Sequence, residues 1–139
     1  LGVMFKFLDL QINGCFGVDF NSDDLSADQF LFAATELNRQ QPHRFLATII
    51  TDDLQAMCRR IAVLSNFIHR FPESNCVGIH VEGPFISNVA GYVGAHPAVD
   101  TLEANDTAFD QLLRAGNGAI KLMTLAPERD LEGKITRRC

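Results

Sequence analysis

The sequence has 139 residues, of which 47% are hydrophobic and 21% charged, as is ordinary for a single globular domain. Its formal net charge of −5 and its pI of about 5.2 argue against a nucleic-acid-binding protein, whose contact surface would be basic. No apolar run approaches the roughly 18 residues that a membrane-spanning helix needs, so we expect no membrane partner.

The start of the chain and its cysteines indicate a cytoplasmic protein. The opening LGVMFKFLDLQ has no small-residue cleavage site, so we expect no signal peptide, and since it begins at Leu1 the true start can lie upstream. Cys15, Cys58, Cys76 and Cys139 form no Cys-x-x-Cys pair. Scattered cysteines in a chain long enough to have a real core are typical of reduced, buried thiols.

A strand and a helix are predicted at the start of the chain. Residues 5–12, FKFLDLQI, form an apolar run that ends at an Asn-Gly turn pair. Ser26 and Gln29 have the spacing of a capping box, and Pro42 ends the helical pattern. One helical face between them is apolar, with Phe30, Ala33, Ala34 and Leu37.

A second strand and a longer helix follow. Residues 45–50, FLATII, are apolar and β-branched, and Asp52 is a candidate N-cap for the helix after them. A Phe-Pro pair at 71–72 ends this helix. Its inward face is predicted to carry Leu54, Met57, Cys58, Ile61, Leu64 and Ile68.

The remaining elements are a strand, a glycine-rich loop, a short helix and a last strand. Residues 76–81 and 119–125 are the two strands, the second closed by an Ala-Pro pair. Asp106 is a candidate N-cap of the short helix, which Gly116 ends. The apolar residues of that helix are Phe109, Leu112 and Leu113.

Apolar strands that alternate with amphipathic helices predict a parallel sheet in a single α/β unit over residues 1–139. Two architectures suit this order, a doubly wound open sheet and part of a (β/α)8 barrel. A whole barrel needs about 250 residues, so this sequence can hold only half of one. Both architectures place ligands at the carboxyl ends of the strands.

Polar residues gather where the predicted strands end. His80 and Glu82 lie two apart in a strand, so their side chains should share one face of the sheet. The alternative is that strand ends are simply where polar residues become tolerable. The residues in question are Gln11, Asn13, His80, Glu82, Lys121 and Thr124.

Four segments carry a family resemblance: DLQINGCFGVDFN (9–21), HVEGPFIS (80–87), GAHP (94–97) and LAPE (125–128). In this order they resemble the N-acetylglucosamine-6-phosphate deacetylases of the amidohydrolase superfamily. The resemblance implies a partial (β/α)8 barrel of the metallo-dependent hydrolase type, with about four parallel β/α units. It also implies a cytoplasmic hydrolase that converts N-acetylglucosamine 6-phosphate, an amino-sugar phosphate, to glucosamine 6-phosphate and acetate.

The resemblance implies that Glu82 binds the catalytic divalent metal, which is zinc, or alternatively iron or another transition metal. A cation there would explain a carboxylate at a strand end. In the family, two further histidine ligands and the catalytic aspartate follow later strands that this sequence does not contain. We therefore assign no catalytic residue in this chain and expect it to be inactive alone.

The same resemblance implies roles for five other residues. Gln11 and Asn13 stand where many amidohydrolases carry two histidines, so they would hydrogen-bond a metal-bound water or neighbours, unless they only satisfy the turn that follows. His80 would support the site or pack beside it. Ala95 and His96 would contact the substrate through a backbone amide and an imidazole, unless His96 is simply exposed.

Three interpretations remain open at this stage. The chain is a piece of a deacetylase, or a non-catalytic half-barrel that self-associates as a binding or regulatory module. The third is an unrelated α/β enzyme with His80 and Glu82 as an acid–base pair. A half-barrel has unpaired strand edges, so we expect a homo-oligomer.

Overall fold

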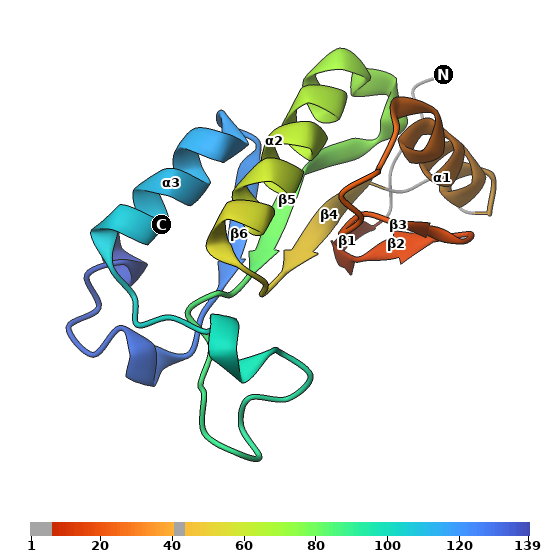
Figure 1. Ribbon diagram of the computed structural model, residues 1–139. Coiled ribbons are helices and arrows are strands. Elements are labelled where there is room, and N and C mark those ends of the chain that lie inside the picture. The colour runs from red at the N-terminus through yellow and green to blue at the C-terminus, as the bar shows by residue number, and fades with distance from the viewer. Residues whose placement is uncertain (1–6, 41–43) are drawn as a thin grey trace.

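The computed structural model describes residues 7–40 and 44–139 and contains a four-stranded parallel sheet (Figure 1). Every neighbouring pair in the order β1-β4-β5-β6 is parallel, so each strand lies beside the one that precedes it in this sheet. The predicted α/β sheet is confirmed. Phe5, Lys6 and Pro42, which the predictions above used, lie outside the described residues. The strands are β1 (Leu8–Ile12), β4 (Arg44–Ile50), β5 (Cys76–Glu82) and β6 (Ile120–Thr124).

A short antiparallel hairpin, which the sequence analysis missed, follows β1. Its strands are β2 (Gly14–Cys15) and β3 (Val18–Asp19). The two residues between them have positive φ angles, 54° at Phe16 and 79° at Gly17. Positive φ at both central positions belongs to the tight turn that joins hairpin strands most readily, and Gly17 accepts it without strain.

In the described residues, three α-helices connect the strands: α1 (Ala27–Gln40), α2 (Leu54–Arg70) and α3 (Asp106–Gly116). The predicted capping box at α1 is confirmed. The Ser26 amide donates to Gln29 Oε1 at 2.9 Å, and the Gln29 amide donates to Ser26 Oγ at 3.2 Å. No helix in the part of the chain that the structure describes is long and apolar enough to cross a membrane.

The other two predicted N-caps are wrong by one residue. Asp53, not Asp52, accepts the first amides of α2, and Asn105, not Asp106, accepts from the Ala108 amide of α3. Asp52 binds Arg60 instead, with its Oδ2 2.6 Å from the Arg60 Nη1. In both cases two adjacent residues can cap, and the point at which the preceding strand or loop delivers the chain selects between them.

The core lies between the sheet and the helices. Helix α2 packs on β4, β5 and α3, and Figure 1 shows α2 and α3 on the same side of the sheet. Of the three apolar residues named on α3, Phe109 and Leu112 are buried in the core and Leu113 is exposed. The largest buried side chains include Phe20, Phe30, Phe45, Phe85, Phe109, Met57, Ile61 and Leu64.

Candidate functional site

The candidate site is at the carboxyl ends of β1, β5 and β6. Glu82 is the last residue of β5 and lies beside Ile50 of β4 and Thr124 of β6. Gln11 of β1 reaches across to it, and its Nε2 donates to Glu82 Oε2 at 3.0 Å. Two residues that are 71 positions apart therefore meet at one edge of the sheet, as expected if they share a site.

The backbone at Glu82 is held on both sides. Thr51 Oγ1 donates to the Glu82 carbonyl at 3.0 Å, and the next amide, that of Gly83, donates to the Thr124 carbonyl at 3.0 Å. Gly83 has a φ of +97°, and a Cβ there would lie 2.0 Å from Thr51 Oγ1. Only glycine fits this position, so the chain can turn sharply and leave the Glu82 carboxylate at the rim.

His80 of β5 is held between two threonine hydroxyls, one on each neighbouring strand, β4 and β6. Its Nδ1 is 3.3 Å from Thr48 Oγ1 and its Nε2 is 2.8 Å from Thr124 Oγ1, and the residue is only 2% exposed. Burial lowers the pKa of His80, and the charge of Glu82 acts against that shift. To act as an acid or base, the imidazole would have to break its hydrogen bond with one of these threonines.

A long loop brings His96 toward Glu82. We call residues 88–100 the arm; Figure 1 shows them in the loop that extends from the sheet between β5 and α3. His96 Nε2 lies 4.0 Å from Glu82 Oε1, whereas Gln11 binds the other oxygen of that carboxylate, Oε2. A cavity of about 480 Å³ lies here, and its lining includes Glu82, Ser87, Tyr92, Ala95, His96 and Glu128.

Two of the polar residues singled out from the sequence contribute differently from Gln11 and Glu82. The exposed Asn13 accepts the Phe20 amide through its backbone carbonyl at 2.9 Å, which helps to close the hairpin. Lys121 does not join the rim, because its Nζ donates to the Gly118 carbonyl at 2.9 Å, before the amino end of β6.

Asn21 is a residue that the sequence analysis did not single out. Its Nδ2 donates to the Thr48 carbonyl at 3.0 Å, and its Oδ1 accepts from the Ile50 amide at 2.9 Å. The amide group therefore pairs with the backbone of β4 much as a neighbouring strand would. The only signal for it was its place at the end of the 9–21 motif, since a loop asparagine has no periodicity to mark it.

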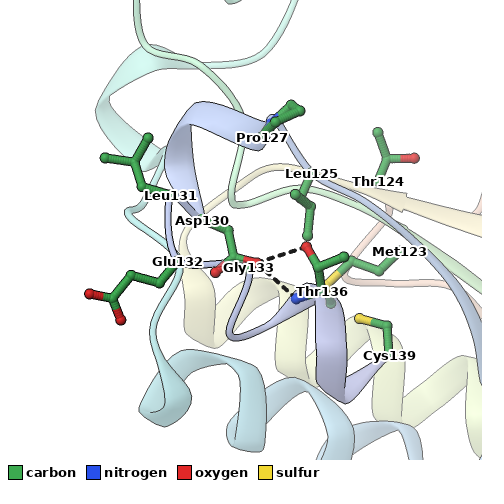
Figure 2. Close-up of a pocket in the computed structure, with 10 residues that line it drawn as sticks. All are labelled: Met123, Thr124, Leu125, Pro127, Asp130, Leu131, Glu132, Gly133, Thr136 and Cys139. Carbon is green, nitrogen blue, oxygen red and sulfur yellow. Dashed lines mark hydrogen bonds between the residues drawn. The ribbon is translucent and has the colours of Figure 1, made fainter.

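A larger cavity, of about 680 Å³, lies beside β6 and the last ten residues (Figure 2). Its most buried carboxylate is that of Asp130, which accepts from the Thr136 amide at 2.8 Å and from Thr136 Oγ1 at 2.7 Å. These hydrogen bonds hold the chain's last turn, and no histidine lines the cavity. The chemistry that the sequence predicts is therefore placed better in the cavity at Glu82.

The donors at Glu82 fit a metal ion only in part. Within residues 7–40 and 44–139, no three His, Cys, Asp or Glu side chains are grouped so that they could hold a metal. A catalytic zinc usually has three protein ligands. The Glu82 carboxylate is a donor that such a metal accepts, so this chain can supply one ligand to a site that other residues complete.

Comparison with known proteins gives the relationship of the chain. No family model matches it. The N-acetylglucosamine-6-phosphate deacetylase of Bos taurus is 35% identical over 138 residues, which cover 94% of this chain and 32% of that enzyme. The human enzyme of the same name is 32% identical over 138 residues, with the same shares covered.

This chain is homologous to one third of N-acetylglucosamine-6-phosphate deacetylase. Solved structures of the same enzyme agree. The Mycobacterium smegmatis deacetylase, in complex with N-acetyl-D-glucosamine-6-phosphate, has a TM-score of 0.74 and 27% identity over 94% of this chain and 32% of that one. The Thermotoga maritima deacetylase has a TM-score of 0.77 and 25% identity over 97% and 35% of the two chains.

The deacetylase structures also settle the choice between the two architectures. The parallel sheet with its helices corresponds to part of the α/β barrel of these enzymes, as the motifs predicted. The chain spans about one third of the length of the relatives that it matches.

Proposed function

We propose that this chain is part of an N-acetylglucosamine-6-phosphate deacetylase and supplies one side of its active site. The observation that carries this proposal is the meeting of Gln11, Glu82 and His96 at one rim, in a chain homologous to these enzymes. The complete protein would hydrolyse the acetamide of N-acetylglucosamine 6-phosphate and release acetate and glucosamine 6-phosphate.

Glu82 is the proposed ligand of one divalent metal ion, for which we favour zinc. When bound, such an ion supplies Lewis-acid polarisation of the scissile carbonyl. Gln11 contributes by donating to Glu82 Oε2, which fixes the carboxylate and leaves Oε1 toward the cavity. A hydrogen bond that orients a metal-binding group in this way is a common source of affinity.

The cavity beside Glu82 is the proposed place for the sugar. Ala95 and His96 line it, and they are the residues that the resemblance assigns to substrate contact. His80 would keep its contacts with Thr48 and Thr124 and support the strand that carries Glu82. No residue of this chain is proposed as the catalytic base.

The proposed location of the protein is the cytoplasm, which agrees with the four cysteines being free thiols.

We also propose that the chain self-associates. Leu8 and Leu10 are half exposed on β1, which pairs with β4 alone among the strands of the described residues. An edge strand with exposed apolar side chains favours pairing with another chain.

The test is an acetate-release assay on two proteins. One is the chain alone, which we expect to be inactive with or without added zinc. The other joins it to the remaining two thirds of the Bos taurus relative, and this protein should be active. In the joined protein, Glu82→Gln should abolish acetate release together with bound metal, whereas Gln11→Ala should reduce acetate release less.

A matched control is Glu132→Gln, which removes an exposed carboxylate from the other cavity and should leave acetate release unchanged. Full activity of Glu82→Gln in the joined protein would contradict the proposed role of that carboxylate. Hydrolysis by the isolated chain at a rate that depends on Glu82 would show that the site is complete without other residues.

A further inference from the structure

We propose that Arg129 is the residue that holds the arm over Glu82 and so positions Ala95 and His96. That these two residues then contact a sugar rests on the proposed function, whereas the position of the arm does not. Arg129 ends the short 3-10 helix Pro127–Arg129 that follows β6, so it belongs to a different β/α unit from the arm.

The guanidinium of Arg129 contacts the chain at both ends of the arm. Its Nη1 lies 3.5 Å from Oδ1 of Asn88, the first residue of the arm. Just beyond the last residue of the arm, Nη2 lies 3.5 Å from Thr101 Oγ1 and Nε donates to the Leu102 carbonyl at 3.3 Å. Nη1 also forms an ion pair with Glu103.

Backbone hydrogen bonds also hold together the segments at the two ends of the arm. The Ala104 amide donates to the Arg129 carbonyl at 2.9 Å, and the Leu102 amide donates to the Pro84 carbonyl at 2.9 Å. The side chain of Arg129 is only 10% exposed, and its contacts with the Leu102 carbonyl and Thr101 Oγ1 are partly buried. Hydrogen bonds to a charged group are stronger than neutral ones, and more so where water is excluded.

The arm has little else to hold it. No residue from 88 to 100, all of which the structure describes, is buried, and Tyr92 is 79% exposed. A segment with few buried apolar contacts opens at low free-energy cost unless its ends are fixed. The contacts of Arg129 with the two ends of the arm are therefore the main restraint on the distance between His96 and Glu82.

An arginine suits this task better than a lysine. Its planar head carries five N–H donors in a fixed arrangement, so it can serve a carbonyl, a hydroxyl, an amide oxygen and a carboxylate together. A lysine has one flexible nitrogen and would satisfy only some of these groups. Arg129→Lys should therefore loosen the arm in part.

The motion of the arm can be followed through the fluorescence of Tyr92. Tyr92 is the only tyrosine of a chain that has no tryptophan, so the tyrosine fluorescence of the protein comes from the arm alone. In Arg129→Met, we expect its anisotropy to fall as the arm gains motion on the nanosecond scale. Amide exchange over residues 88–102 should become about tenfold faster, the change expected when a charge-assisted hydrogen bond is lost.

The matched control is Arg60→Met. Arg60, on α2, has a similar exposure of 13%, and it pairs with Asp23 in the loop before α1 and with Asp52 just before α2, neither of which belongs to the arm. The Arg60→Met variant should have a lower unfolding temperature and an unchanged Tyr92 fluorescence anisotropy. A fall in anisotropy of equal size in both variants would mean general loosening and would overturn the proposal.

Milder variants keep the test sharp if Arg129→Met does not fold. Asn88→Ala and Thr101→Val each remove one partner of the guanidinium and leave Arg129 in place. Each should raise amide exchange in the arm by a smaller factor than Arg129→Met or Arg129→Lys. Unchanged exchange and anisotropy in all the folded variants would show that Arg129 does not hold the arm.

Discussion

Cys76 offers a measure of how tightly the core behind the site is packed. It is the first residue of β5, at the opposite end of that strand from Glu82, and is only 3% exposed. Its Sγ lies 3.5 Å from the Gly78 carbonyl, to which it donates. Burial raises the pKa of this thiol from 9.0 to about 11, because a thiolate there would lose its water. We predict that alkaline pH destabilises the fold through this group.

The sign and size of the effect follow from proton binding. Between pH 9 and 11 the unfolded chain loses the Cys76 proton while the folded chain keeps most of it, so the free energy of unfolding falls as pH rises. Below pH 9 both states are protonated and the term vanishes. With the two pKa values two units apart, the loss is about 2 kcal/mol by pH 11.

The assay is urea unfolding at pH 8, 9, 10 and 11 for the wild type and Cys76→Ala, with comparison of the slopes against pH. Other titrating groups contribute to both proteins and cancel in the difference. Cys139→Ala, which removes an exposed thiol, should keep the decline that Cys76 causes. If the wild type and Cys76→Ala lose stability in parallel from pH 8 to 11, the thiol is not held neutral by the core and the reasoning fails.

Two further predictions concern the helix start and the assembly. Ser26→Ala removes the hydroxyl that accepts the Gln29 amide, and should lower the free energy of unfolding by about 1 kcal/mol in urea titrations; an unchanged midpoint would contradict the capping role. The chain should form dimers or larger species in light scattering as its concentration rises, because β1 leaves apolar side chains exposed at an unpaired edge of the described sheet. A monomer at every concentration would contradict this.

The sequence predicted the strands and helices well because their signals are local. The apolar runs at β4 and β5 and the capping box at Ser26 and Gln29 need no knowledge of the rest of the fold. The hairpin at Phe16 was missed because its strands are only two residues long, which is too short for any period to show. The caps at Asp53 and Asn105 depended on where neighbouring elements deliver the chain, which is a tertiary effect.

The sequence predicted the edge of the sheet at which the site lies, but not the side-chain contacts within the site. Alternation in strands places His80 and Glu82 on one face, and parallel pairing brings Gln11 to the same rim. The contact between Gln11 Nε2 and Glu82 Oε2 depends on strand register, which one sequence does not specify. The anchoring of the arm by Arg129 links residues 26 to 41 positions apart through loops, where no periodic pattern points to a partner.

The order β1-β4-β5-β6 bears on how the chain is made. Each strand of this sheet needs only the strand synthesised just before it, with one connecting segment between the two. A nascent chain can therefore add each β/α unit to a finished surface while the ribosome is still translating the next one. During this growth the newest strand is always an exposed edge, in addition to β1, so a pause in translation after β6 would present that edge to chaperones or to another nascent copy.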